Sequence, residues 1–419
     1  MSETNQVISF GCRLNQHEGD VIEHVIMGNT ENSIVVNTCA VTNEAEKKAV
    51  QTIRNLKKNK PDAKIFVTGC AAQINPDKFA AMPEVHMVLG NHDKLVPQNY
   101  SMMEKKIVVS ELPTKSKPLI YDVEKTTSKT RMLIEVQNGC DHSCTFCCIP
   151  LGRGKSRSMP LGAIAQCIEK ALLNGCKEIV FTGVDITAYG NDLPVKINLG
   201  QAIQRLLKLF PSLPRMRLSS LDVAEIDQDL INLFKNEQRL MPHIHISMQS
   251  GDNMILKRMK RRHTRSQVIE FCNNLQHYRS DITYGADLIV GFPTENDEMF
   301  QNSINLIKEA RISHLHVFPF SPRNNTPAAK MPQVPFNIIK QRVKIARNAG
   351  LEMKKILYNN SIGEEHSVLI ENSKSSDVVS KGHTANFMKV KANTKLPAGS
   401  IIKLKIIKHN NGHLLANMI

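Results

Sequence analysis

Three cysteines lie close together in the segment Cys140-Asp141-His142-Ser143-Cys144-Thr145-Phe146-Cys147. A [4Fe–4S] cluster contains four irons and is usually held by four cysteine thiolates. Three thiolates at spacings of four and three residues would leave one iron open to a further ligand, as a catalytic centre requires. A structural zinc ion is the alternative, but it needs four protein ligands, so Cys148 or His142 would have to complete the set. The spacing therefore favours an iron–sulfur centre.

Three further cysteines repeat one pattern in the first hundred residues. Cys12, Cys39 and Cys70 each follow a short apolar run, at residues 7–10, 34–36 and 65–68. Apolar residues at helical spacing over 45–56 place a helix between the second and third runs, which predicts a parallel sheet. Ligands gather at the carboxyl ends of such strands, so we expect the three thiols to converge there. Each thiol alone could be a buried structural group, but together they predict a second metal site that lacks a fourth cysteine.

Residues 131–357 alternate between strand and helix patterns about six times. This alternation predicts a partial (β/α)6 barrel, a fold that carries its chemistry in the loops after the strands. The first three-cysteine segment follows the first of these strands. The predicted strands cover residues 132–136, 179–182, 216–218, 244–247, 286–290 and 315–318.

The ends of the chain complete the predicted fold class, an α/β multidomain protein. Runs at 387–392 and 401–406 alternate with period two around a turn at 397–399, which predicts a small antiparallel β-barrel. Residues 101–130 are polar and contain two prolines, and we interpret them as a linker with one strand over 106–109. The predicted domains are an N-terminal parallel-sheet α/β domain at 1–105, the partial barrel at 126–357 and the terminal barrel at 360–419.

The charge balance points to a polyanionic partner. The chain has 54 Lys and Arg against 39 Asp and Glu, a net charge of +15, which favours nucleic acid ahead of a membrane surface. With 14 Phe, 6 Tyr and no Trp, base stacking cannot be the main source of affinity, so binding should depend steeply on salt. The candidate RNA contacts are Arg153, Lys155, Arg157, Arg261, Arg262, Lys389, Lys391, Lys403 and Lys405.

Composition also limits the compartment and the class of protein. The apolar and charged fractions, 41% and 22%, exclude a disordered or collagen-like chain. No apolar stretch approaches the roughly 20 residues that a bilayer span needs, so no membrane association is expected. The ten cysteines and the polar N-terminus predict a cytoplasmic protein, in which clustered cysteines hold metals more often than they form disulfides.

The Cys140–Cys147 segment resembles the Cys-x3-Cys-x2-Cys motif of the radical S-adenosylmethionine (SAM) superfamily. The resemblance implies that Cys140, Cys144 and Cys147 hold a [4Fe–4S] cluster whose open iron binds SAM. Electron transfer would then cleave SAM to a 5′-deoxyadenosyl radical, which can attack an unactivated C–H bond.

The flanking sequences are similar to those of the radical SAM methylthiotransferases. The similar motifs are Gly11-Cys12-Arg13-Leu14-Asn15, Asn37-Thr38-Cys39-Ala40-Val41-Thr42, Thr68-Gly69-Cys70-Ala71-Ala72-Gln73 and Gly152-Arg153-Gly154-Lys155-Ser156-Arg157-Ser158. The resemblance covers nearly the whole chain and implies a methylthiotransferase domain, a radical SAM core and a C-terminal TRAM domain. It also implies a second, auxiliary [4Fe–4S] cluster on Cys12, Cys39 and Cys70, with an open iron that carries the sulfur to be inserted.

Within that family, the motifs around Cys12 and Cys39 most resemble the branch that acts on N6-threonylcarbamoyladenosine at position 37 of tRNA. The resemblance implies hydrogen abstraction from C2 of the base, insertion of sulfur and methyl transfer from a second SAM. The alternatives are methylthiolation of isopentenyladenosine in tRNA or of a ribosomal protein aspartate, and a non-catalytic RNA-binding iron–sulfur protein. The implied partners are the tRNA anticodon stem-loop, an electron donor of flavodoxin or ferredoxin type and a sulfur donor, and we expect a monomer.

Several residues outside the cysteine motifs are candidate SAM contacts. Phe146 either packs on the SAM adenine or belongs to the core. Gly183 and Gly291 end strands at positions that resemble the methionine and adenine ends of the superfamily's SAM site. Ser219 and Gln249 end two other strands and are expected to face the same space. No carboxylate or histidine is an evident base, so we expect no catalytic residue beyond the cluster sites. The cysteines expected to have no role in the chemistry are Cys148, Cys167, Cys176 and Cys272.

Overall fold

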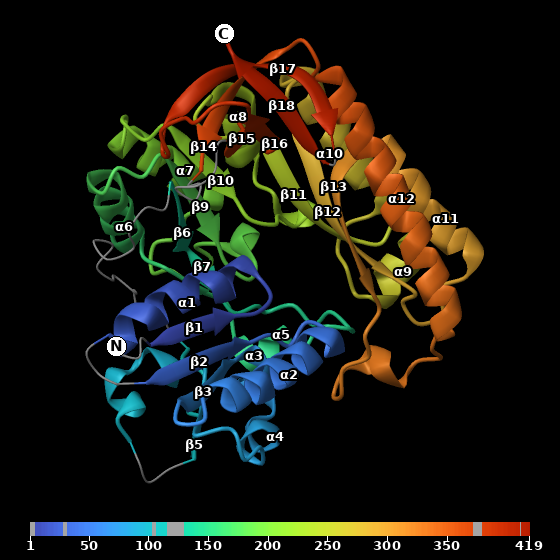
Figure 1. Cartoon of the computed structure of the whole chain (residues 1–419). Coiled ribbons are helices and arrows are strands. Elements are labelled where there is room, and N and C mark those ends of the chain that lie inside the picture. Colours follow the sequence, from blue (N-terminus) through green and yellow to red (C-terminus); the bar gives the residue numbers. More distant parts are fainter. Residues whose placement is uncertain (1–4, 28–31, 103–105, 115–129, 372–378, 411) are drawn as a thin grey trace.

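A computed structural model shows three domains along the chain, and the predicted fold class is confirmed (Figure 1). The structure describes residues 5–27, 32–102, 106–114, 130–371, 379–410 and 412–419. The predicted boundary at residue 126 lies outside these ranges.

The N-terminal domain is built on a five-stranded, wholly parallel sheet with the strand order β1-β2-β3-β4-β5. The last strand pairs with β4, so the sheet continues past residue 105, where the sequence prediction ended the domain. The strands are β1 (Gln6–Ser9), β2 (Ser33–Thr38), β3 (Lys64–Gly69), β4 (Met87–Leu89) and β5 (Ile107–Val108). The helices are α1 (Arg13–Ile26), α2 (Asn43–Asn59), α3 (Cys70–Ile74) and α4 (Pro76–Ala80).

Helix α2 shows why this part of the sequence folds as predicted. The Thr42 side chain caps the helix by accepting a hydrogen bond from the amide of Ala45, which satisfies one of the free donors of the first turn. Ala49 and Ile53 are fully buried against the sheet, while the basic face points away from it. The helix therefore joins two parallel strands, as the apolar spacing indicated.

The central domain contains all six predicted strands, arranged as two three-stranded parallel sheets. Isolated bridges from Met216 to Leu240 and from Leu221 to Ile246 join the sheets into one curved, incomplete barrel (Figure 1). The strands are β6 (Arg131–Glu135), β9 (Glu178–Thr182), β10 (Arg215–Leu218), β11 (His243–Gln249), β12 (Thr283–Val290) and β13 (Ile312–Pro319), and a short hairpin pairs β7 (Gln137–Asn138) with β8 (Arg157–Ser158). The helices are α5 (Ile149–Arg153), α6 (Leu161–Leu173), α7 (Leu199–Leu209), α8 (Gln228–Asn236), α9 (Asn253–Arg258), α10 (Arg265–Tyr278), α11 (Asp297–Glu309) and α12 (Phe336–Asn360).

Helix α12 leads into a closed five-stranded C-terminal barrel. One of its pairings, between β16 and β18, is parallel, which corrects the expectation of a wholly antiparallel barrel. The chain reaches this arrangement because β17 lies between β16 and β18 in sequence but at the far side of β18 in the sheet. The strands are β14 (Glu365–Ile370), β15 (Ser380–Thr384), β16 (Lys389–Ala392), β17 (Ile401–Asn410) and β18 (His413–Met418).

The C-terminal barrel docks at the amino ends of the central strands. Arg217 donates a hydrogen bond to the carbonyl of Thr384 (2.9 Å), and Arg215 donates one to the carbonyl of Ser367 (2.9 Å). Thr283, at the start of β12, donates a hydrogen bond to the carbonyl of Asn386 (2.7 Å). The opposite, carboxyl ends of the strands stay free for the cysteine loop.

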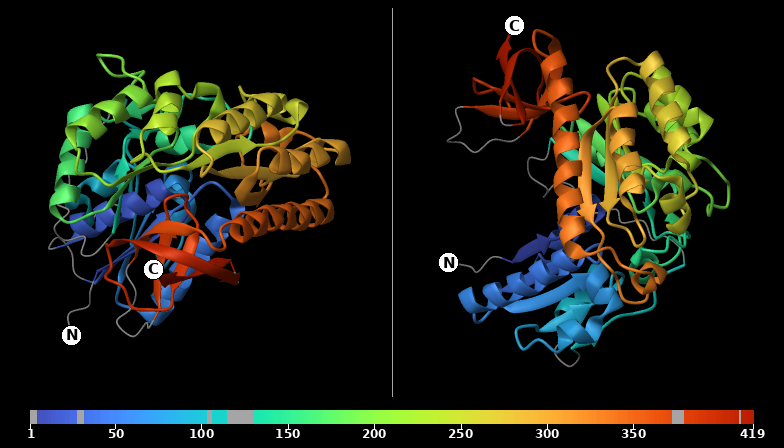
Figure 2. Two further views of the ribbon diagram at one scale, coloured as in Figure 1. Left: turned by 90° about the horizontal axis from the view of Figure 1, so that it is seen from above. Right: turned by 90° about the vertical axis from the view of Figure 1, so that its right-hand side faces the viewer.

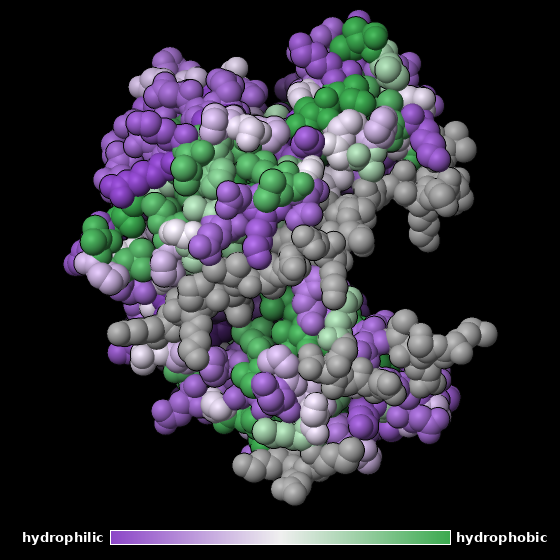
Figure 3. All heavy atoms as spheres, turned by 90° about the vertical axis from the view of Figure 1, so that its left-hand side faces the viewer, coloured by the Kyte–Doolittle hydropathy of each residue, from purple (hydrophilic) through white to green (hydrophobic). Residues whose placement is uncertain are grey.

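The N-terminal domain and the C-terminal barrel project from the same side of the central domain, with an open notch between them (Figure 2, right; Figure 3). The space-filling view shows this notch as a hollow in the outline of the molecule. In the described part of the chain, no helix combines the length and the apolar character that a bilayer span requires.

Candidate metal centres and active site

The loop that carries Cys140, Cys144 and Cys147 is held at its middle by Thr145. The Thr145 hydroxyl donates to the carbonyl of Arg258 (2.8 Å), and its amide donates to the carbonyl of Met259 (3.2 Å). Its own carbonyl accepts from the amide of Ala328 (2.9 Å). The loop is therefore tied to two distant parts of the central domain.

Backbone amides and one arginine point at these sulfurs. The amide of His142 donates to Cys140 Sγ and the amide of Ile149 donates to Cys147 Sγ, each at 3.4 Å. Arg261 lies 3.7 Å from Cys144 Sγ. Burial raises the pKa of Cys140 and of Cys147 to about 12, so these thiols keep their protons until a metal displaces them. Donors to the sulfurs then stabilise the thiolates and tune a bound cluster.

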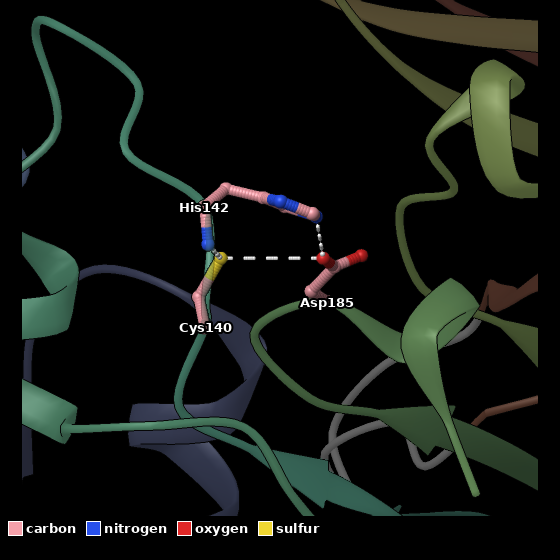
Figure 4. A group of neighbouring side chains, drawn as sticks. All are labelled: Cys140, His142 and Asp185. Atoms are coloured by element: carbon pink, nitrogen blue, oxygen red, sulfur yellow. Dashed lines mark hydrogen bonds and ion pairs between the residues drawn. The ribbon is translucent and has the colours of Figure 1, made fainter. Parts of the chain in front are cut away.

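His142 closes one side of the loop (Figure 4). Its Nε2 lies 2.8 Å from Asp185, which follows β9, and 3.4 Å from Glu225. These hydrogen bonds raise the pKa of His142 to about 10, and the Arg262 guanidinium, 2.7 Å from the same Nε2, opposes this rise. The sequence did not predict that Asp185 and Glu225 lie beside His142, because both are distant from it along the chain.

The N-terminal cysteines follow strands β1, β2 and β3 at one edge of the sheet, as predicted. Gly11 has φ +90°, and a Cβ there would lie 2.5 Å from Cys39 Sγ, so only glycine lets the first and second motifs approach this closely. Cys39 and Cys70 are buried, whereas Cys12 is exposed. Burial raises the pKa of Cys39 to about 12.

A buried ionic network holds Cys70. Arg153, at the end of α5 in the central domain, donates from Nε to Cys70 Sγ (3.2 Å). Its other nitrogens bind both carboxylate oxygens of Glu18 (2.8 and 2.7 Å), and Lys94 binds the same carboxylate at 2.9 Å. Burial alone would raise the pKa of Glu18, but Arg153 and Lys94 hold it at about 2.

The two sets of cysteines meet at the interface between the first two domains. Cys148 Sγ, directly after Cys147, lies 3.3 Å from the carbonyl of Ala40, directly after Cys39. Helix α3, which begins at Cys70, packs against α5, which follows Cys147. The sequence predicted each set but could not show that they face one another. Cys167, Cys176 and Cys272 are buried in the core of the central domain, and Cys148 is buried in the N-terminal core.

The predicted SAM residues lie around the cysteine loop. The Phe146 ring is half-buried and packs edge-on against Phe292 (6.4 Å between centroids). Gly183 approaches the backbone of Gln137 so closely that a Cβ would lie 2.4 Å from its carbonyl oxygen, and Gly291 has φ +74°. Gln249 sits at a bulge in β11 with φ +63°, and Ser219 follows β10. The close backbone contact at Gly183 and the positive φ at Gly291 each favour glycine, whether or not a ligand binds beside them.

The predicted RNA contacts divide by burial. Arg153, with 2% of its surface exposed, is committed to Glu18 and Cys70, and Arg157 donates to the carbonyls of residues 153 and 155. The Arg261 side chain is 9% exposed and binds Asp222 (2.9 Å). The structure thus places these three side chains in buried contacts within the protein, and Arg262 pairs with Asp222 and Glu225. Their contact with phosphate stays a prediction. The exposed or half-exposed candidates are Lys155, Lys389, Lys391, Lys403 and Lys405.

Comparison with known proteins agrees with this geometry. Residues 134–307 match the Radical SAM superfamily, and residues 4–90 match the uncharacterized protein family UPF0004. The chain is 48% identical over 410 residues to threonylcarbamoyladenosine tRNA methylthiotransferase MtaB of Rickettsia prowazekii, covering 98% of this chain and 96% of that protein. This chain belongs to the radical SAM methylthiotransferase family. It is also 32% identical over 426 residues to tRNA-2-methylthio-N(6)-dimethylallyladenosine synthase of Ehrlichia chaffeensis (95% of this chain, 96% of that protein).

The fold of this family member resembles that of a solved radical SAM methyltransferase, TsrM from Kitasatospora setae, with a TM-score of 0.54 at 13% identity over 78% of this chain and 77% of that chain. Membership of the radical SAM superfamily implies SAM and one [4Fe–4S] cluster as cofactors.

The residues present fit clusters better than a single zinc ion. Ligands around one zinc at about 2.3 Å would place their sulfurs about 3.8 Å apart. Among the described residues, which include all six motif cysteines, the groups whose ligand atoms lie within 4.8 Å of one another contain no set of three cysteines. The one group with a cysteine joins Cys140, His142 and Asp185, which are already bound to each other.

Proposed function

We propose that this chain methylthiolates C2 of N6-threonylcarbamoyladenosine at position 37 of tRNA, using a radical SAM cluster on Cys140, Cys144 and Cys147 and an auxiliary [4Fe–4S] cluster on Cys12, Cys39 and Cys70. The observation that carries the proposal is the meeting of two three-thiol sets across one interface, through Cys148 and Ala40. Substrate specificity is supported by the Rickettsia relative, which is named for this nucleoside.

The bound cofactors would supply the radical, the sulfur and the methyl group. The protein's own residues orient the ligands and hold the two sites in register. Thr145 fixes the loop, the amides of His142 and Ile149 orient the sulfurs, and Arg153 ties Cys70 to the central domain. Cys39, Cys70 and Cys148 are buried where the two domains meet, which restricts water between the two sites.

Iron and sulfide content of anaerobically purified protein tests the two-site arrangement. We expect about eight irons per chain in the wild type and about four in Cys39→Ala and in Cys140→Ala, because each variant loses one four-iron cluster. Cys272→Ala, which removes a buried thiol of the central core, is the control. Eight irons in both motif variants would refute the proposal.

The substrate is tested separately by mass spectrometry of tRNA nucleosides from a strain that lacks the gene. We expect 2-methylthio-N6-threonylcarbamoyladenosine to disappear and its unthiolated precursor to accumulate. If the strain instead lacks methylthiolated isopentenyladenosine in tRNA, or the methylthiolated aspartate of a ribosomal protein, that molecule is the substrate and the proposed one is wrong. Reduced, reconstituted protein that makes no 5′-deoxyadenosine from SAM would instead indicate a non-catalytic iron–sulfur protein.

The remaining expectations stay predictions. They concern an electron donor of flavodoxin or ferredoxin type, a sulfur donor, a monomeric state and a cytoplasmic location.

A further inference from the structure

The inner face of the central barrel, opposite its helices, is lined by charged and aromatic side chains. Strands β11, β12 and β13 turn Ile244, Tyr284 and Leu315 toward the core, and the residues that alternate with these lie on the inner face. These include His243, His245, Asp287, His314 and His316, together with Arg131, Glu178 and Arg217 from the first three strands.

Phe387 of the C-terminal barrel enters this face from the amino ends of the strands. Its ring stacks on His243 and on His383, at 4.9 and 5.0 Å between centroids. Three guanidiniums surround the same ring, with the Cζ atoms of Arg13, Arg131 and Arg217 at 5.6, 5.6 and 5.1 Å from its centroid. Three positively charged side chains thus surround one half-buried aromatic ring.

Two of these cations are neutralised by carboxylates. Glu178 pairs with Arg131 and with Arg217, at 2.9 Å from the latter, and Glu371 lies 3.1 Å from Arg131. A second carboxylate of this face, Asp287, is held by His245 (3.0 Å) and His316 (3.3 Å). A further carboxylate of this face, Glu135 at the end of β6, accepts a hydrogen bond from Asn138 (3.0 Å) through one oxygen.

Arg13 is the exception. Its guanidinium makes no hydrogen bond or ion pair with any residue that the structure describes, although it is largely withdrawn from solvent. A charged group in such surroundings is costly without a partner of opposite charge. Arg13 also follows Cys12 directly and begins α1, which packs against β6, so it reaches from the auxiliary cysteine site into the barrel.

We propose that Arg13 binds the carboxylate of the threonyl group of the substrate base. The inference rests on the proposed function, which brings C2 of the adenine close to both three-cysteine sites. The N6 substituent then extends along the inner face toward Phe387, and its carboxylate pairs with the guanidinium of Arg13. An arginine fork suits a carboxylate because it can donate two parallel hydrogen bonds. Recognition of this group makes Arg13 a specificity-determining residue.

Binding of an anticodon stem-loop RNA to the reconstituted protein, with SAM but without reductant, tests the inference. The RNA carries at position 37 either the threonylcarbamoyl base or its neutral methyl ester. We expect the wild type to bind the acid roughly tenfold to a hundredfold more tightly than the ester, as for hydrogen bonds to charged groups. Arg13→Gln should lose this preference by weakening only the acid, and Arg13→Lys should keep part of it.

The control is Arg54→Gln, which removes an exposed arginine of α2 and should keep the full preference. Equal binding of acid and ester by the wild type would overturn the inference without touching the proposed function. A raised Kd for SAM in Arg13→Gln, with the acid preference intact, would assign Arg13 to the carboxylate of SAM and also overturn it. If Arg13 only supports Phe387, the variant will lose thermal stability and weaken acid and ester equally. Failure of the wild type to modify threonylcarbamoyl tRNA would remove the proposed function and this inference together.

Discussion

Arg153 shows how one side chain connects two chemical sites. Its guanidinium donates to Cys70 of the N-terminal domain, while its backbone belongs to the segment after Cys147. Donors to cluster sulfurs orient the ligands and set their electron density. The same guanidinium donates to the Glu18 carboxylate, which accepts a further hydrogen bond from Lys94. These contacts fix the position of the Arg153 side chain.

Replacing Arg153 with Gln should therefore weaken the auxiliary site specifically. We expect a tenfold to hundredfold loss of iron affinity there, because outer-sphere partners of metal ligands typically have effects of about that size. Electron paramagnetic resonance of the reduced protein should show the auxiliary signal shifted or lost and the radical SAM signal retained. Lys155→Gln, which removes an exposed cation from the same segment, should leave both signals unchanged.

At this scale the sequence predicted the two sets of cysteines but not the side chains that contact them. Cysteine spacing is local, so all six thiols could be assigned from the chain. The role of Arg153 depends on Glu18, 135 residues away, and a charged side chain in sequence does not reveal that it is buried. The sequence predicted Arg153 as an RNA contact, and the structure instead shows it bound to Glu18 and Cys70.

Among the secondary structure elements, β9 connects the inner face of the barrel to the C-terminal domain. Glu178 at its first position is fully buried and faces Arg131, Arg215 and Arg217, two of which bind the C-terminal barrel. Burial alone would raise the pKa of Glu178, but Arg217 and Arg131 lower it to about 2.

Glu178→Gln should lower stability by about 3–5 kcal/mol, because it leaves buried arginines without their counter-charge. The wild-type contribution of Glu178 is present above the ordinary pKa of 4.5 and is lost as pH falls from there toward 2. The difference in unfolding free energy between variant and wild type should therefore shrink as pH falls below about 4.5. Denaturant unfolding at several pH values measures this, with the exposed Glu169→Gln as control.

The strands themselves were predictable because buried parallel strands are short, apolar and β-branched. All six central strands and the first three N-terminal strands lie where these runs occur. The parallel pairing of β16 with β18 could not be predicted in this way. Alternation of apolar and polar residues shows which face of a strand is buried, but it does not show which strand is its neighbour.

At the scale of the whole molecule, two domains flank one notch (Figure 2). Exposed lysines of β16 and β17 lie on the outer surface of the C-terminal barrel. The proposed RNA would be held by these charges and presented to the central domain from the notch.

A double variant, Lys403→Gln with Lys405→Gln, should reduce the salt dependence of RNA binding. Each lost phosphate contact lowers the slope of log K against log salt by about 0.7–0.9, so a total change of about 1.4–1.8 is expected. Binding of an anticodon stem-loop across a range of salt concentrations measures the slope. Lys196→Gln with Lys208→Gln, two exposed lysines of the central domain, should leave it unchanged.

The contact of Phe387 with Arg13 joins the two ends of the polypeptide inside the middle domain. During translation, the first domain leaves the ribosome long before Phe387 is made. The inner face of the barrel must therefore stay accessible to water until the segment that carries Phe387 emerges. A nascent chain stalled before Phe387 would carry both sets of cysteines, but the inner face of its central barrel would be open to water.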